Sequence, residues 1–215
     1  MLHTHYWTEL AWTDFEALDN SRLIAVLPLA AVEQHGPHLP LGVDHFIMEG
    51  YLERVIERLP GDFFLNVQGD EPFIQPALLD GLITRWKETR CPLVTAVSRI
   101  TTAERLLASS VVKVVRAENG EAIYFSRSPI PHLRGVDPAE WVSRRAYWVH
   151  IGVYGYDRAT LAGYAQLRAT ELEATESLEQ LRFLAHGKTF QTVVTDYHPV
   201  AIDTPEDLAV ARGMV

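Results

Sequence analysis

Apolar and polar positions along the chain fall into blocks that predict strands and helices in turn. Leu23 to Ala31 is an apolar run of strand length, and Phe46 to Leu59 has apolar residues three and four apart, which is typical of an amphipathic helix. Phe63 to Val67 is a second strand-length run, and Leu78 to Trp86 again has helical spacing. Because such strands are joined by right-handed crossovers, the pattern predicts a mainly parallel sheet between two layers of helices.

The middle of the chain departs from this alternation. Val111 to Arg116 and Glu121 to Ser126 alternate apolar and polar residues about Asn119-Gly120, a dipeptide suited to a tight turn with positive φ. Strands are predicted again at His150 to Tyr156 and Thr189 to Thr195. We therefore expect one α/β domain over residues 1–215, with a three-layer α/β/α architecture, a mixed sheet that is mainly parallel, and a β-hairpin excursion.

The composition excludes several classes of function. With 19 Lys and Arg against 28 Asp and Glu, the net charge of −9 argues against a non-specific grip on nucleic acid. Cys91 is the only cysteine, so no internal disulfide can form, which suits a reducing cytoplasm. The sequence has no secretory leader pattern and no run near the ~20 apolar residues of a membrane span. We expect a soluble, cytoplasmic protein that binds a small molecule.

One group of metal-binding residue types lies near the N-terminus. Glu33 and His35 are two residues apart, so in an extended backbone both project to one side, and Asp44 stands at the start of the predicted helix. Carboxylate and imidazole together suit Zn²⁺ or Mn²⁺, and such a metal can activate water for hydrolysis. The alternative interpretation is a polar loop in which Asp44 caps the helix.

A second group of candidate residues follows the later strands. Asp70 comes after the strand at Phe63 to Val67, and Asp203 precedes a capped helix. The carboxyl ends of parallel strands are where open α/β sheets bind ligands, and two carboxylates suit Mg²⁺. Both aspartates could instead be turn or capping residues. Arg127 lies just beyond the predicted hairpin, where a guanidinium can clamp the carboxylate of an acidic sugar.

The N-terminal group lies within a family resemblance. A segment that resembles the N-terminal metal motif of the creatininase (creatinine amidohydrolase) family is Glu33-Gln34-His35-Gly36-Pro37-His38-Leu39-Pro40-Leu41-Gly42-Val43-Asp44. The resemblance extends from about Trp7 to Pro60 and implies that Glu33, His35 and Asp44 are Zn²⁺ or Mn²⁺ ligands. Nothing after residue 61 matches the further His and Glu ligands of that family.

Five later blocks resemble another family, CMP-KDO synthetase (3-deoxy-manno-octulosonate cytidylyltransferase). They are Asn66-Val67-Gln68-Gly69-Asp70-Glu71-Pro72, Tyr124 to Pro131, His150 to Tyr154, Glu176 to Leu181 and Ile202 to Asp207. The resemblance implies a nucleotide-diphospho-sugar transferase-like fold, a homodimer, and attack of an acidic sugar on CTP. It implies catalytic residues Asp70 and Asp203, both holding Mg²⁺. It also implies a sugar site made by Gln68, Arg127, His150, Tyr154, Glu176 and Gln180.

The two resemblances together predict an engineered chimera, with a creatininase-like segment over residues 1–61 and a cytidylyltransferase-like segment over residues 62–215. The second family begins with an Arg-, Ser-, Gly- and Lys-rich segment that binds CTP, whereas residues 1–61 contain no lysine and only Arg22, Arg54 and Arg58. We therefore expect binding of an acidic sugar and Mg²⁺ with little or no turnover of CTP. The alternatives are a creatininase-like metal-dependent amidohydrolase and a folded scaffold without activity.

Overall fold

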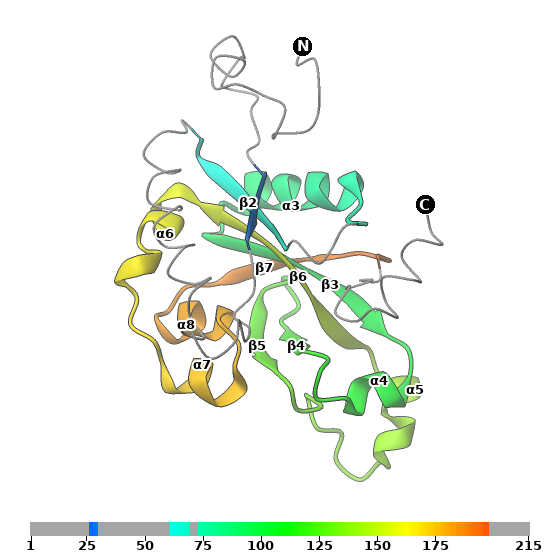
Figure 1. Cartoon of the computed structure of the whole chain (residues 1–215). Coiled ribbons are helices and arrows are strands. Elements are labelled where there is room, and N and C mark those ends of the chain that lie inside the picture. The colour runs from blue at the N-terminus through cyan, green and yellow to red at the C-terminus, as the bar shows by residue number, and fades with distance from the viewer. Residues whose placement is uncertain (1–25, 30–60, 69–72, 198–215) are drawn as a thin grey trace, which may run out of the picture.

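A computed structural model describes residues 26–29, 61–68 and 73–197, which form a mixed α/β structure (Figure 1). The described strands are β1 (Val26–Leu29), β2 (Phe63–Gln68), β3 (Leu93–Ile100), β4 (Lys113–Arg116), β5 (Ala122–Ser126), β6 (Tyr147–Asp157) and β7 (Phe190–Val194). The described helices are α3 (Pro76–Thr89), α4 (Ala103–Leu107), η3 (Pro138–Glu140), α5 (Trp141–Arg144), α6 (Arg158–Ala162), η4 (Tyr164–Gln166), α7 (Glu171–Glu176) and α8 (Gln180–Ala185).

The strands lie in the order β1-β2-β6-β3-β7, with β4 paired to both β5 and β6. Strand β1 is parallel to β2 and β3 is parallel to β7, while β6 is antiparallel to both β2 and β3. The sheet is therefore mixed, as expected, but β6 interrupts the parallel order that the alternation of strands and helices predicted. Strand β4 is antiparallel to both β5 and β6, so β5 and β6 run in the same direction.

Turn and capping residues account for much of the local structure. The hairpin turn about Asn119 and Gly120 is confirmed, and Gly120 has the positive φ of 84° that this turn requires. Helix α4 is capped by Thr102, whose side chain accepts a hydrogen bond from the backbone N–H of Arg105. A reciprocal capping box starts α7, where Thr170 pairs with Glu173. The helix expected at Phe46 to Leu59 lies outside the described residues.

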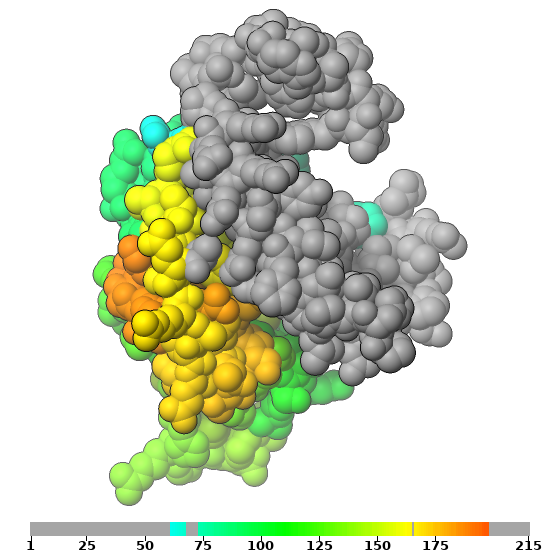
Figure 2. Space-filling model, turned by 60° about the vertical axis from the view of Figure 1, so that its left-hand side comes forward, coloured from blue at the N-terminus to red at the C-terminus, as the bar shows by residue number. Residues whose placement is uncertain are grey.

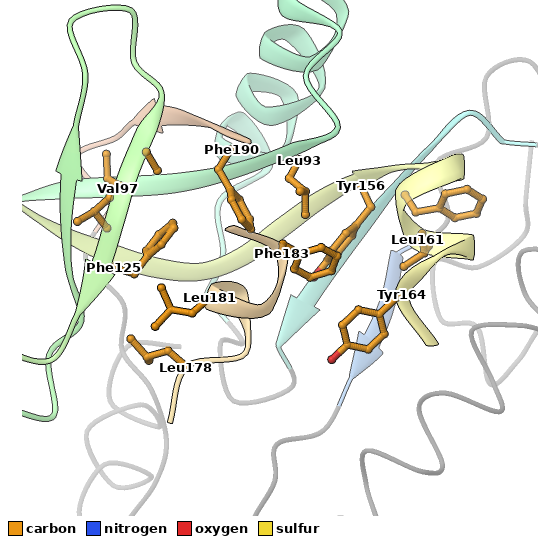
Figure 3. Close-up of a cluster of buried hydrophobic side chains, with 13 residues drawn as sticks. Leu93, Val97, Phe125, Tyr156, Leu161, Tyr164, Leu178, Leu181, Phe183 and Phe190 are labelled. Carbon is orange, nitrogen blue, oxygen red and sulfur yellow. The ribbon is translucent and has the colours of Figure 1, made fainter. Parts of the chain in front are cut away.

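Helices cover opposite faces of the sheet. Under α3, Leu78 and Leu82 pack with Val94 and Ile151 in one buried cluster. On the other face, side chains of α6 and α8 and of the segments beside them pack on the strands, and Figure 3 shows Leu181 and its aromatic neighbours in this cluster. Figure 2 shows the segments from α6 to α8, yellow to orange, side by side on the surface of this face. None of the described helices has the length and apolar character needed to cross a membrane.

Strand β6 contributes to both buried faces through its alternating side chains. Ile151 and Val153 point into the cluster under α3, whereas Tyr154 and Tyr156 pack against the cluster on the α8 face. Residues at even spacing along a strand share a face, so His150 lies on the α8 side with Tyr154. The direction and register of β6 therefore place two of the predicted sugar-binding residues on one face.

A close approach between β2 and β6 depends on Gly155. A Cβ atom at this position would lie 2.1 Å from Phe63 Cζ and 2.6 Å from Val94 Cγ2. The ring of Phe63 is held in place by stacking on Trp86, with 4.7 Å between the ring centroids. The aromatic pair occupies the space that a side chain at position 155 would need.

We expect Gly155→Ala to lower the free energy of unfolding by roughly 1–3 kcal/mol, because the added methyl group overpacks this contact. Urea denaturation followed by circular dichroism measures the change. Gly61→Ala is the matched control, since its Cβ would meet neighbours at 3.7 Å or more and should change stability by less than about 0.5 kcal/mol. Equal stability of the two variants would contradict the proposed close contact.

Candidate functional site

The end of β5 is tied to the end of α7 by the carboxylate of Glu176. Ser126 Oγ donates a hydrogen bond of 2.6 Å to Glu176 Oε1, and the backbone N–H of Arg127 donates one of 2.9 Å to Oε2. The Ser126 hydroxyl also accepts a hydrogen bond of 3.0 Å from the backbone N–H of Ser128. Glu176 therefore fixes the backbone from which the Arg127 side chain projects.

The guanidinium of Arg127 is oriented by backbone carbonyls. Its Nε donates to Glu176 O at 2.8 Å, while the two terminal nitrogens donate to Ser109 O at 3.2 Å and Ser177 O at 3.3 Å. These contacts use three of the five N–H groups of a guanidinium and leave one on each terminal nitrogen. Two N–H groups are the number that a bidentate contact with a carboxylate requires.

A buried lysine lies behind this arginine. Lys113 is fully buried, and its Nζ donates to Ala108 O at 2.8 Å, to Val111 O at 2.6 Å and to Arg127 O. Burial lowers the pKa of Lys113, the charge of Arg127 lowers it further, and that of Glu176 opposes the shift. Lys113 thus joins the backbone of Arg127 to segment 108–111. Ser109 in this segment also accepts a hydrogen bond from the Arg127 side chain.

A second set of predicted residues meets between β6 and α8. Tyr154 Oη donates to Gln180 Oε1 at 3.4 Å, and the ring centroids of His150 and Tyr154 are 5.2 Å apart. The His150 ring also lies edge-on to Phe125, at 5.1 Å between centroids. Phe125 and Ser126 are consecutive residues of β5, so this set and the Glu176 contacts adjoin the same end of that strand.

Burial keeps the two β6 side chains uncharged. It lowers the pKa of His150 from 6.5 to about 3, so the imidazole is neutral at neutral pH. Burial also raises the pKa of Tyr154 far above its ordinary value, and the charge of Glu179 and the proximity of Tyr164 add to the shift. Both residues are therefore suited to neutral hydrogen bonding, the kind of contact that sugar hydroxyl groups make.

The structure brings together five of the residues singled out in the sequence, in two adjoining sets: Arg127 with Glu176, and His150 with Tyr154 and Gln180. Gln68 ends β2, where its backbone pairs with Leu29. The predicted metal ligands Asp70, Asp203, Glu33, His35 and Asp44 lie outside the described residues. Within residues 26–29, 61–68 and 73–197, no group of three His, Cys, Asp or Glu side chains gathers for a metal.

Sequence reasoning missed the residues that support these side chains. Ser126 belongs to a block that was noted for Arg127, and its hydroxyl gave no separate signal. Lys113 was not singled out, although a single lysine between Val112 and Val114 is an unusual feature in a buried strand. A buried cation that bonds only carbonyls has no partner of opposite charge that a sequence pattern would reveal.

Two family models match the chain. The model described as "Cytidylyltransferase" matches residues 51–190, and the model described as "Creatinine amidohydrolase" matches residues 8–79. The two matched ranges overlap over residues 51–79, which include β2 and the start of α3. Both resemblances noted in the sequence are therefore confirmed as family matches.

Curated proteins similar to the chain are named 3-deoxy-manno-octulosonate cytidylyltransferase. The Cytophaga hutchinsonii protein is 44% identical over 176 residues, which cover 80% of this chain and 67% of that protein. The Geotalea uraniireducens protein is 42% identical over 163 residues, which cover 73% of this chain and 65% of that protein. The chain thus spans about two thirds of the length of these relatives.

A solved structure shares the fold. It is described as CMP:2-keto-3-deoxy-manno-octonic acid synthetase complexed with CTP, and it is 33% identical to this chain with a TM-score of 0.70. The match covers 77% of this chain and 66% of that one. The mixed α/β sheet described above is therefore the fold of that synthetase structure.

The low pKa of His150 predicts a specific dependence of stability on pH. An unfolded histidine takes up a proton near pH 6.5, whereas the folded one does so near pH 3. Between these values the unfolded state binds the extra proton, so the contribution to stability is complete above pH 6.5 and is lost as pH falls toward 3. Each proton corresponds to a slope of about 1.4 kcal/mol per pH unit.

We expect His150→Gln to flatten this part of the curve, measured as the free energy of unfolding in urea between pH 6.5 and 4. The exposed His186 provides the control, because His186→Gln should keep the wild-type slope. A wild-type slope in His150→Gln would show that the folded imidazole protonates like the unfolded one.

Proposed function

This chain belongs to the cytidylyltransferase family, and we propose that its described part binds the acidic sugar 3-deoxy-manno-octulosonate (KDO). The observation that carries the proposal is the arrangement of Arg127, whose guanidinium is oriented by three carbonyls and keeps one N–H on each terminal nitrogen. A guanidinium held in this way is prepared for a planar carboxylate, and less side-chain entropy is lost on binding.

The neighbouring residues suit the hydroxyl groups of the same ligand. The neutral side chains of His150 and Tyr154 lie on β6, and Gln180 lies at the start of α8. Glu176 has both carboxylate oxygens in hydrogen bonds to the end of β5, so its first role is to hold Arg127. The proposal therefore assigns recognition of the carboxylate to Arg127, and recognition of the hydroxyl groups to the β6 and α8 side chains. Gln68 is proposed to contact the sugar from the end of β2.

The reaction proposed for the family site is the transfer of a cytidylyl group to this sugar. The anomeric hydroxyl forms a new bond to the α-phosphorus of CTP, the bond to the β-phosphate breaks, and the hydroxyl proton and diphosphate leave. Charge on the phosphates must be offset by cations in such a step. Residues 1–61 contain only Arg22, Arg54 and Arg58 and no lysine. We therefore propose that the chain binds the sugar with little or no transfer.

The proposed Mg²⁺ site rests on Asp70 and Asp203, which lie outside the described residues. Mg²⁺ at two carboxylates would offset negative charge on phosphate groups when it is bound. Recognition of the sugar by Arg127 and the β6 side chains does not require it.

The organisation of the chain is part of the proposal. Strand β1 belongs to the creatininase-like segment and pairs with β2 from Val26 opposite Leu65 to Leu29 opposite Gln68. This pairing supports one domain over residues 1–215 in which the two segments share a sheet. The chimeric origin and the homodimer implied by the family resemblance stay predictions.

We expect Arg127→Ala to weaken KDO binding by about 10- to 100-fold, because a charge-assisted bidentate contact is lost. Isothermal titration with KDO measures the effect. Arg134→Ala is the matched control, since Arg134 is an exposed arginine in the loop beyond β5. A sugar alcohol of similar size without a carboxylate should bind both variants equally weakly. Unchanged KDO affinity in Arg127→Ala, or no binding to the wild type, would refute the proposed site.

The match to creatinine amidohydrolase over residues 8–79 favours a second candidate function. Glu33, His35 and Asp44 would hold Zn²⁺ or Mn²⁺, and the metal would lower the pKa of a bound water for attack on an amide. None of these three residues is among those proposed for the sugar site.

Under this second function, the chain should bind about one Zn²⁺ or Mn²⁺ per molecule, as a three-ligand catalytic site does. Metal analysis after dialysis should show this content lost in His35→Ala and kept in His38→Ala, the nearby histidine that the motif does not assign as a ligand. Metal content that is the same in both variants would exclude a site at His35.

A further inference from the structure

A bulge in the β3–β6 pairing leaves backbone groups without strand partners. Thr95 pairs with Tyr154 but Ala96 pairs with Ile151, so Gly152 and Val153 have no counterpart on β3. The side chain of Thr95 is fully buried, and its Oγ1 donates to Val153 O at 2.8 Å and lies 3.4 Å from Ile151 O. The hydroxyl of Thr95 thus gives Val153 O a hydrogen bond in place of the strand pairing that Val153 lacks with β3.

The same hydroxyl is 2.9 Å from His150 Nε2. A threonine hydroxyl has one proton, and a carbonyl oxygen can only accept. Because the proton of Thr95 is directed to Val153 O, its oxygen must accept from the imidazole, which requires a proton on Nε2. A neutral imidazole carries a single N–H, so Nδ1 is left with a lone pair.

The surroundings of His150 allow the Nδ1 lone pair to accept a hydrogen bond from a ligand. Within the described residues, no donor forms a hydrogen bond with Nδ1, and the ring is held by its edge contact with Phe125 and its tilted contact with Tyr154. The hydroxyl of Tyr154 is directed to Gln180 Oε1, which leaves the amide N–H groups of Gln180 as donors. An acceptor and a donor on neighbouring side chains complement a sugar hydroxyl, which can both donate and accept.

We propose that Thr95 is a positioning residue that holds His150 in the Nε2–H tautomer, so that Nδ1 accepts a hydrogen bond from a hydroxyl of the bound sugar. The assignment of a sugar as the ligand rests on the function proposed above. The tautomer itself follows from the contacts of Thr95 and is present in the free protein. Because the pKa of His150 is low, the imidazole does not take up a second proton at neutral pH, and Nδ1 stays an acceptor.

The tautomer can be read directly by NMR of protein with ¹⁵N-labelled histidine, because protonated and unprotonated ring nitrogens have well separated chemical shifts. The His150 signals are identified by their loss in His150→Gln. We expect Nε2 to be protonated in the wild type and in Thr95→Ser, which keeps the hydroxyl. In Thr95→Val and Thr95→Ala the preference should shift toward Nδ1–H. An Nδ1–H wild type, or an unchanged tautomer in both variants that lack the hydroxyl, would overturn the proposal.

The melting temperature of each variant separates positioning from folding. If Thr95→Val and Thr95→Ala both fail to fold, the wild type and Thr95→Ser still test the proposal, because an Nδ1–H imidazole in either of them would overturn it.

A titration with KDO tests the acceptor role separately. We expect Thr95→Val to bind KDO about 3- to 10-fold more weakly than the wild type, as for one lost hydrogen bond, and Thr95→Ser to stay within about 2-fold. A changed tautomer with unchanged affinity would overturn the role of Nδ1. If the wild type binds no KDO while the NMR result holds, the proposed function fails and the tautomer assignment stands.

Discussion

Strand β6 lies between β2 and β3 and is hydrogen-bonded to both, so the position of every other strand depends on it. Its odd-numbered side chains from Ile151 to Val153 pack beneath α3, while its even-numbered ones face α8. One face of the strand therefore builds the core and the other carries His150 and Tyr154. Because both functions use one backbone, the bulge opposite Thr95 affects the packing and the candidate site together.

Charge in the candidate site is balanced by a small set of groups. The carboxylate of Glu176 accepts from the end of β5, and the cations of Arg127 and Lys113 donate to backbone carbonyls instead of forming side-chain ion pairs. Two cations near a single carboxylate leave an excess of positive charge. Burial lowers the pKa of Lys113 and the charge of Arg127 lowers it further, and the excess of positive charge favours the binding of an anion.

The parts of this fold that the sequence predicted depend on nearby residues. Gly120 marks the hairpin because few residues adopt its positive φ, and α3 is visible from its apolar spacing. The antiparallel direction of β6 was not predictable, since it arises from pairing with strands about fifty to ninety residues away. Arg127 was proposed from its position beyond the hairpin as well as by family resemblance, whereas His150 was identified by the resemblance alone. Thr95 was not predicted, because a threonine within an apolar strand looks the same in the sequence whether its hydroxyl contacts an imidazole or has no functional contact.

The proposed chimera separates the requirements of folding from those of catalysis. Strand β1 pairs with β2 through backbone groups, and parallel backbone pairing makes few demands on sequence beyond apolar side chains. A segment from another α/β family can therefore complete the sheet. Backbone pairing alone does not supply phosphate-binding cations, because these depend on particular side chains at particular positions. Apart from Gln68 at the end of β2, the proposed sugar contacts lie on β5, β6 and the α7 to α8 segment. Under the proposal, recognition of the sugar can therefore persist where transfer does not.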